Sequence, residues 1–256
     1  MSPIVDRAVF QELSRLAREV AAAHSGSPEV ESKSIGLFDP VTDVDRNIES
    51  ALHQFISCRF RSDGIVGEEL GGQRPEASRR WSIDPIDGTR SYLCGLPTWS
   101  ILVGVVEEGR HVASMIDVPS MSELFIAVDN KTLRNGVAVR TSGITKLAEA
   151  RLSTTDPYLF VGAEAAAFQR MRNASMLTRY GLDGFAYARL AAGDLDLVME
   201  SGLKTHDYDA LIPVVRGAGG HIGDWDGGED FATGRILAAA TRRLYDEAVA
   251  LIGLGS

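Results

Sequence analysis

The hexapeptide DPIDGT, residues 84–89, constrains this chain more than any other stretch. It sets two carboxylates, Asp84 and Asp87, three residues apart at the end of an apolar run. Carboxylates this close repel each other unless positive charge lies between them. Gly88 permits close backbone approach, and the amides of Gly88 and Thr89 at the start of a predicted helix are suited to an anion. The hexapeptide therefore predicts a cation beside a phosphate-binding turn.

Two other segments contribute pairs of acidic residues. The stretch VGEEL carries Glu68 and Glu69 after a short apolar run, and THDYDA carries Asp207 and Asp209 at the start of a predicted helix. Each pair alone is typical of a turn, a solvated face or a helix cap. Divalent cations such as Mg²⁺ take oxygen ligands, and two-metal hydrolytic sites need carboxylates from separate segments. Together with DPIDGT, these pairs predict a divalent-metal site.

Composition narrows the classes of partner. With 26 basic and 35 acidic residues, the net charge of −9 disfavours nucleic acid and anionic lipid as partners. A bound divalent metal would supply the positive charge that an anionic substrate needs. We find no signal peptide and no run of about 18 apolar residues, so the sequence predicts a cytoplasmic protein without a membrane partner. The two cysteines, Cys58 and Cys94, are predicted to be reduced packing residues.

Hydrophobic periodicity predicts a chain of alternating helices and strands. Residues 4–23 and 42–60 have helical spacing, and Thr42 or Asp43 can cap the second helix. The predicted strands are 81–84, 100–106, 111–118, 123–128, 149–155, 194–200 and 235–240, and the later predicted helices are 162–175, 185–193, 210–220 and 242–252. This order predicts helices packed on sheets in one compact unit, with an N-terminal half over residues 1–145 and a C-terminal half over residues 146–256.

The N-terminal part of the chain carries three motifs: DPVTDVDRNIE (39–49), VGEE (66–69) and DPIDGT. They resemble the motifs of the inositol monophosphatase family of metal-dependent phosphomonoesterases. Three C-terminal stretches resemble the histidinol-phosphate phosphatase branch: LSTTDPYLF (152–160), AYARLAAGDLDLVMESGLK (186–204) and DYDALIPVVRGAGGHIGDWDG (207–227). The resemblance covers nearly the whole chain. It implies a mixed α+β or α/β fold, a layered αβαβα sandwich.

The resemblance also implies the site residues. Those implied to bind metal are Glu68, Asp84, the backbone carbonyl of Ile86, Asp87 and Asp207. Gly88 and Thr89 are implied to bind phosphate, and Asp45 to polarise the Thr89 hydroxyl. Those implied or suggested to face the alcohol portion of the substrate are Asp183, Glu200 and His206, with Lys33 a weaker candidate. In this scheme Glu68, Thr89 and Asp45 are the catalytic residues.

The implied activity is magnesium-dependent hydrolysis of a small phosphate monoester by a metal-activated water. Two or three Mg²⁺ ions are expected, with Mn²⁺ possible, together with inhibition by lithium and a homodimer. Histidinol phosphate, an intermediate of histidine biosynthesis, is the first expected substrate. The branch motifs differ here at Leu182, Gly184, His206 and Arg216, which leaves inositol 1-phosphate or another polyol phosphate open. A nucleotide 3′-phosphatase and a non-catalytic regulatory homologue are the remaining alternatives.

Overall fold

The computed structural model describes residues 4–24, 28–32 and 40–253 of the 256-residue chain. Its helices are α1 (Arg7–Ala23), α2 (Asp43–Arg59), α3 (Thr89–Leu93), α4 (Ala163–Ala174), α5 (Asp183–Ala191), α6 (Thr205–Gly217) and α7 (Arg242–Gly253). Its strands are β1 (Val30–Ser32), β2 (Pro40–Thr42), β3 (Gly64–Gly67), β4 (Gly72–Gln73), β5 (Arg79–Asp87), β6 (Ser100–Glu107), β7 (Arg110–Val118), β8 (Glu123–Val128), β9 (Lys131–Arg134), β10 (Val137–Ala138), β11 (Arg151–Thr154), β12 (Leu177–Tyr180), β13 (Leu197–Glu200), β14 (His221–Asp224) and β15 (Ile236–Ala239).

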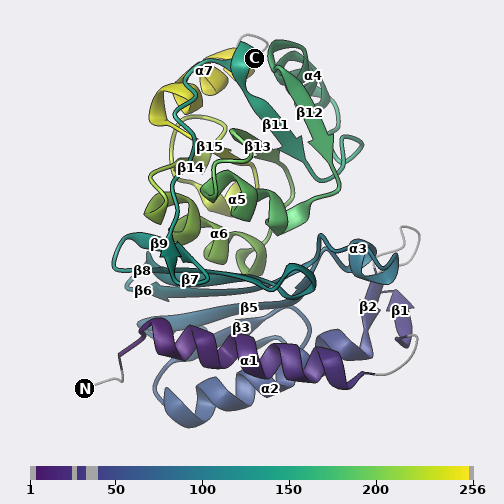
Figure 1. The fold of residues 1–256 in the computed structure, drawn as a ribbon, viewed down its shortest axis with the longest axis vertical. Helices are drawn as coiled ribbons and strands as arrows, with labels where there is room; N and C mark the ends of the chain where they lie inside the picture. Colours follow the sequence, from purple (N-terminus) through teal and green to yellow (C-terminus); the bar gives the residue numbers. More distant parts are fainter. Residues whose placement is uncertain (1–3, 25–27, 33–39, 254–256) are drawn as a thin grey trace.

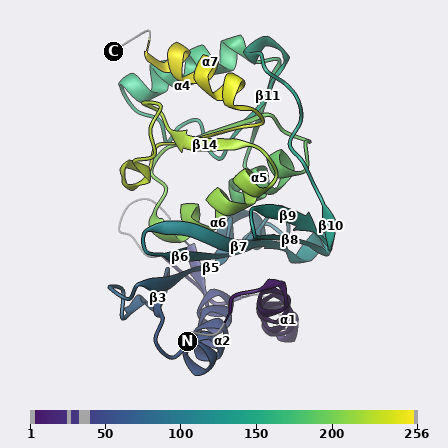
Figure 2. The ribbon, with the colours of Figure 1, turned by 90° about the vertical axis from the view of Figure 1, so that its left-hand side faces the viewer.

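The elements form five layers, as Figures 1 and 2 show. Helices α1 and α2 cover one face of an eight-stranded sheet of order β10-β9-β8-β7-β6-β5-β3-β4. Helices α5 and α6 lie between this sheet and a five-stranded sheet of order β12-β11-β13-β15-β14, whose outer face carries α4 and α7. The predicted αβαβα sandwich is confirmed. In the sequence, the strands of the eight-stranded sheet all precede residue 145 and those of the five-stranded sheet all follow it. The division into two halves itself stays a prediction.

Alternation along the central strands explains why both faces of the large sheet are covered. Ile101 and Val103 of β6 belong to the apolar core beneath α1 and α2. Leu102, between them, belongs to the core formed with α5 and α6. Successive side chains of a strand point to opposite faces, so a continuous apolar run is buried on both sides. The site residues of β5 are consequently placed in the interior of the molecule.

Local capping sets where the first two helices begin. Asp6 accepts a hydrogen bond from the amide of Val9, so α1 begins at Arg7 and not at residue 4 as predicted. Thr42 caps α2 through the amides of Val44 and Asp45, which decides between the two predicted caps. Both caps satisfy amides that have no partner within the helix.

Other sequence predictions need correction. Strands β12 and β14 were not predicted, because β12 is a largely exposed edge strand without apolar alternation and β14 is only four residues long. Both cysteines, Cys58 and Cys94, are free but exposed, so they are not packing residues. Cys58 is on α2, where Ile56 is among the buried residues, and Cys94 ends α3, where Ser91 is buried. No helix in the described ranges combines the length and apolar composition needed to cross a bilayer.

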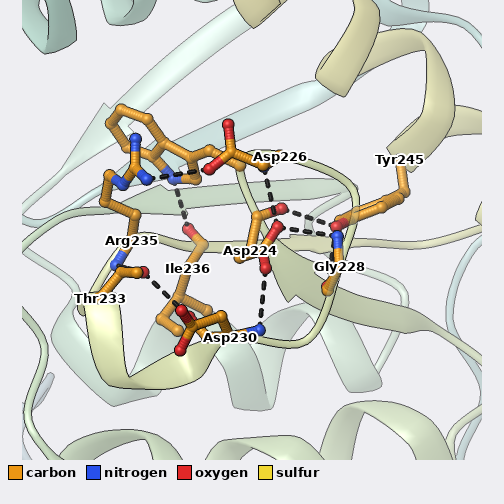
Figure 3. A network of polar contacts seen from close by, with 9 residues as sticks. Asp224, Asp226, Gly228, Asp230, Thr233, Arg235, Ile236 and Tyr245 are labelled. Atoms are coloured by element: carbon orange, nitrogen blue, oxygen red, sulfur yellow. Dashed lines mark hydrogen bonds and ion pairs between the residues drawn. The ribbon is translucent and has the colours of Figure 1, made fainter.

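The loop after β14 is closed by its own backbone amides (Figure 3). The carboxylate of Asp224 accepts hydrogen bonds from the amides of Asp226, Gly228 and Asp230, each over 2.8 Å. The hydroxyl of Tyr245, on α7, donates to the backbone carbonyl of Asp224 over 2.6 Å. The bond from Tyr245 attaches the loop to α7.

Candidate active site

A bulge in β5 brings Asp84 and Asp87 to the same face of the sheet. In a regular strand, residues three apart point to opposite faces. Here Asp84 pairs with Leu102 and Asp87 with Ser100, so three residue steps on β5 oppose two on β6. The extra residue restores a common direction for the two carboxylates. Strand β5 therefore continues to Asp87, whereas the sequence analysis ended it at Asp84.

Glu68 lies beside Asp84 because their strands are parallel neighbours. Strand β3 pairs with β5 in parallel, and the amide of Glu68 donates to the carbonyl of Ile83 over 3.1 Å. Residues that follow adjacent parallel strands meet at one edge of a sheet. The side chain of Glu68 is 19% exposed. This geometry explains how the VGEE and DPIDGT motifs come together.

Glu49, on α2, holds the turn that carries Glu68. Its two carboxylate oxygens accept hydrogen bonds from the amides of Glu69 and Leu70, over 2.8 and 2.9 Å. The Glu49 side chain is fully buried. A Cβ at Gly67 would lie 1.8 Å from Glu49 Oε1, so only glycine fits there. Sequence reasoning included Glu49 in a motif but gave it no role.

Asp207 reaches the site from the first turn of α6, the helix between the sheets. The amide of Lys204 donates to Asp207 Oδ2 over 2.6 Å. His206 Nε2 lies 3.6 Å from Asp207 Oδ1 and 3.8 Å from Glu68 Oε1. The imidazole is thus placed between two predicted metal ligands, and its side chain is 12% exposed. The reading of His206 as a site residue is favoured over a surface position.

Nearly all the predicted site residues line one cavity of about 400 Å³. The predicted site residues that line it are Glu68, Asp84, Ile86, Asp87, Gly88, Thr89, Asp183, Glu200, His206 and Asp207. This volume falls within the range of small-molecule sites, about 300 to 1,000 Å³. Asp45 does not line the cavity, and Lys33 lies outside the described residues. Acidic groups from three distant segments therefore share one chamber.

Asp45 and Thr89 are not hydrogen bonded to each other in the described structure. Thr89 Oγ1 donates to the carbonyl of Ile86 over 3.0 Å. One oxygen of Asp45 accepts from the amide and hydroxyl of Thr42 in a capping box, and its other oxygen is buried without a partner. The predicted polarisation of Thr89 by Asp45 therefore stays a prediction, and it requires Thr89 to turn away from Ile86.

The electrostatics of the cavity fit a bound cation. Burial raises the pKa of Asp84 well above its usual range, and the charges of Glu68, Asp87 and Asp207 raise it further. Burial likewise raises the pKa values of Asp87 and Asp207. Asp84 Oδ1 is buried and has no hydrogen-bond partner among the described residues. A divalent cation among these groups would offset their repulsion and occupy the orphaned oxygen.

The protein groups alone do not complete a metal site. Within the described ranges, no three His, Cys, Asp or Glu side chains are gathered closely enough to hold an ion by themselves. Oxygen-ligand sites for Mg²⁺ also use backbone carbonyls, substrate phosphate and water. The carbonyl of Ile86 lines the same cavity. The donor set therefore fits a cation that takes some of its ligands from substrate and water.

Comparison with known proteins decides the family. The sequence matches the inositol monophosphatase family over residues 5–253. The chain belongs to this family. Bifunctional phosphatase IMPL2 of Arabidopsis thaliana is 41% identical over 191 residues, which are 73% of this chain and 55% of that protein. Histidinol-phosphatase of Chlorobaculum parvum is 31% identical over 84% of each chain.

A solved structure supports the same conclusion. An inositol monophosphatase from Zymomonas mobilis superposes with a TM-score of 0.86 at 33% identity, over 96% of this chain and 97% of that one. Since the family and these relatives are phosphatases, this inositol monophosphatase family member is a hydrolase of phosphoric monoesters. One of these relatives is named a histidinol-phosphatase and the other an inositol monophosphatase, so membership of the family does not determine the alcohol of the substrate.

The cavity in this family member has further acidic side chains besides the predicted metal ligands. Glu200 is buried, and it accepts hydrogen bonds from the amide and hydroxyl of Thr155 over 2.7 and 3.0 Å. Burial raises the pKa of Glu200 to about 8 and that of Asp183 to about 6. Asp156 also lines the cavity, and Asp183 lies near the predicted phosphate-binding turn, since a Cβ at Gly88 would be 3.1 Å from Asp183 Oδ2. These acidic groups suit a ligand that carries positive charge or donates hydrogen bonds.

Sequence reasoning missed several lining residues. Thr155, Asp156, Tyr187 and Lys204 line the cavity, although none was assigned to the site. All four lie inside stretches that resemble the histidinol-phosphatase branch, and that was the available signal. Spacing alone could not find them, because the loop after β11, α5 and the start of α6 meet only in the folded chain.

Asp209, paired with Asp207 in the sequence analysis, is not part of the cavity. It is fully buried and bonds Arg80 Nη2 over 2.9 Å and His111 Nε2 over 2.8 Å. Residues two apart on a helix do not share a face, so Asp209 points away from Asp207. The three side chains join α6 to β5 and β7, and thereby fix the helix that carries Asp207.

Proposed function

We propose that this phosphatase hydrolyses a small phosphate monoester with magnesium, and that histidinol phosphate is its preferred substrate. The observation that carries the proposal is the convergence of Glu68, Asp84, Asp87 and Asp207 on one cavity, with Asp84 Oδ1 buried and unpartnered. A neighbouring turn at Gly88 is in the left-handed conformation, with φ at 80°. Carboxylates that can bind a cation therefore lie next to a backbone turn that can bind a phosphate.

In this proposal the magnesium ligands are Glu68, Asp84, the carbonyl of Ile86, Asp87 and Asp207. Bound magnesium supplies positive charge against the phosphoryl group and lowers the pKa of water toward neutrality. Two or three ions are proposed, and Mn²⁺ is an acceptable substitute because it takes the same oxygen ligands.

The chain's own groups position the phosphate and move the proton. Gly88 and Thr89 are proposed to donate backbone hydrogen bonds to phosphoryl oxygens, which need fixed donors as their charge redistributes. The Thr89 hydroxyl, once released from the Ile86 carbonyl, is proposed to take the proton of the attacking water while its own proton passes to the carboxylate of Asp45. Burial raises the pKa of Asp45 to about 6. Such a pKa lies near the working pH of a proton acceptor.

The acidic side chains of the cavity favour histidinol phosphate. Histidinol carries an ammonium group and an imidazole, whereas inositol is a neutral polyol. Asp156, Asp183 and Glu200 line the cavity, and a cationic group would favour their ionised forms. His206 and Gly184 stand where the branch motifs have other residues, which supports inositol 1-phosphate as the second candidate.

A panel of phosphate-release assays tests the proposal. Histidinol phosphate, inositol 1-phosphate and adenosine 3′,5′-bisphosphate would be compared at equal concentration with magnesium, manganese or a chelator. We expect magnesium-dependent release from all active substrates, with the highest kcat/KM for histidinol phosphate. The Asp87→Asn variant should lose activity by about three orders of magnitude while keeping its fold, because an amide does not neutralise a cation. Wild-type turnover by Asp87→Asn would refute the metal site.

Three further properties belong to this proposal. We propose that lithium inhibits the enzyme by competing at one cation position, that the protein is a homodimer, and that it works in the cytoplasm in histidine biosynthesis. Measuring inhibition by lithium chloride and the mass of the protein in solution by light scattering tests the first two.

A further inference from the structure

Two polar side-chain atoms of the cavity lining are buried without a hydrogen-bond partner among the described residues. One is Asp84 Oδ1, which the proposed cation explains. The other is Tyr187, on α5, which is 1% exposed and whose hydroxyl has no partner. A buried hydroxyl without a partner costs free energy, so such groups are rare in folded proteins. The position of Tyr187 therefore needs an explanation.

Tyr187 lines the cavity together with its carboxylates. It follows Asp183 by four residues on α5, so the two side chains are on the same face of the helix. The carboxylates that act on its hydroxyl by charge are Glu200, Asp87 and Asp207, all of which line the same cavity. Burial, and then these charges, raise the pKa of the Tyr187 phenol well above its usual range. The phenol stays protonated and keeps a hydrogen to donate.

We propose that Tyr187 is a substrate-binding residue whose hydroxyl donates a hydrogen bond to an acceptor atom on the alcohol portion of the phosphate ester. This inference rests on the proposed function and adds a specificity-determining contact to it. The acceptor would be a hydroxyl oxygen or the unprotonated ring nitrogen of an imidazole. A hydroxyl, or the N–H of the other ring nitrogen, can also donate to Glu200, so one ligand group would satisfy both side chains.

The Tyr187→Phe variant tests the proposal, because it removes only the hydroxyl. For histidinol phosphate or inositol 1-phosphate, whichever the wild type prefers, we expect kcat/KM to fall about tenfold. For n-propyl phosphate, whose alcohol has no acceptor, kcat/KM should be unchanged. In calorimetric titrations of magnesium-loaded protein with histidinol or inositol, in the presence of inorganic phosphate, Tyr187→Phe should bind the alcohol about tenfold more weakly.

Unfolding measurements separate this role from a structural one. Since the Tyr187 hydroxyl has no partner in the described protein, the ligand-free midpoint of Tyr187→Phe should equal or exceed that of the wild type. Tyr245→Phe is the matched control, because the Tyr245 hydroxyl donates to the Asp224 carbonyl far from the cavity. Its midpoint should fall while its kcat/KM and alcohol affinity stay unchanged.

The outcomes distinguish this inference from the proposed function. Equal alcohol affinity of wild type and Tyr187→Phe, or no binding of either alcohol to the wild type, would overturn the role of Tyr187. An equal loss of kcat/KM with propyl phosphate would do the same. Alcohol binding that depends on Tyr187, without any phosphate release by the wild type, would overturn the hydrolytic proposal alone.

Discussion

The backbone amide of Gly184 donates a hydrogen bond to Asp87 Oδ2 over 2.7 Å, and so joins the start of α5 to the end of β5. The hydroxyl of Ser100 donates to the same oxygen, also over 2.7 Å. Asp87 is thereby oriented by both layers that enclose the cavity. A Cβ at residue 184 would lie 2.6 Å from this oxygen, closer than real Cβ contacts come. The glycine that departs from the branch motif is therefore required by this backbone position.

Replacing Gly184 by alanine should displace Asp87. We expect Gly184→Ala to lower kcat/KM at least about tenfold, since overpacking costs about 1 to 3 kcal/mol and is relieved here by moving a metal ligand. The magnesium concentration for half-maximal activity should rise. Steady-state phosphate release across a magnesium titration measures both. Gly143→Ala is the control, because a Cβ there meets nothing within 4 Å. Unchanged kinetics in Gly184→Ala would contradict this prediction, because they would mean that α5 shifts to admit the methyl group while Asp87 keeps its position.

Glu49 should act on catalysis through the turn that carries Glu68. Glutamine offers one acceptor oxygen and one NH₂ donor, so Glu49→Gln can accept from only one of the two amides it now holds. We expect the magnesium concentration for half-maximal activity to rise about tenfold, with kcat at saturating magnesium retained. Hydrogen exchange at the amides of Glu69 and Leu70 should become faster.

The exposed Glu12 provides the comparison for Glu49. Glu12→Gln changes the same functional group on α1, where the side chain is 44% exposed, and it should alter neither measurement. If Glu49→Gln lowers kcat at saturating magnesium and leaves the magnesium dependence unchanged, Glu49 does not position a metal ligand.

The stability of the metal-free protein should fall as pH rises, in part through Glu200. Burial raises the pKa of Glu200 from 4.5 to about 8. Between these values the folded protein binds a proton that the unfolded chain releases, so the free energy of unfolding decreases with rising pH. The slope for one such group is about 1.36 kcal/mol per pH unit, or at most about 4 kcal/mol from pH 5 to pH 8.

Glu200→Gln should remove this contribution, because an amide does not titrate. Urea denaturation of metal-free wild type and variant at pH 5, 6.5 and 8 measures the two slopes. Glu149→Gln, at a side chain that is 56% exposed, should keep the wild-type slope. Identical slopes for wild type and Glu200→Gln would mean that Glu200 is ionised in the folded protein throughout this range.

The chemistry of the site could be predicted from the sequence, whereas its geometry could not. DPIDGT and VGEE named Glu68, Asp84 and Asp87, and all three line one cavity. The bulge at residues 85 and 86 was not foreseen, because it depends on the register between β5 and β6. Asp209 was grouped with Asp207 by spacing, but its partners Arg80 and His111 are on strands about a hundred or more residues away.

The sequence by itself determined the alternation of helices and strands, a helix start at Thr42 or Asp43, and the acidic residue types of the site, because periodicity, capping and motif chemistry are properties of neighbouring residues. The layered arrangement was implied by the family resemblance. Only the tertiary structure decided that Glu49 holds the Glu68 turn, that Gly184 holds Asp87 and that Tyr187 faces the cavity. These contacts join residues from 20 to 97 positions apart. The pKa values follow from burial, and burial exists only once the layers have packed together.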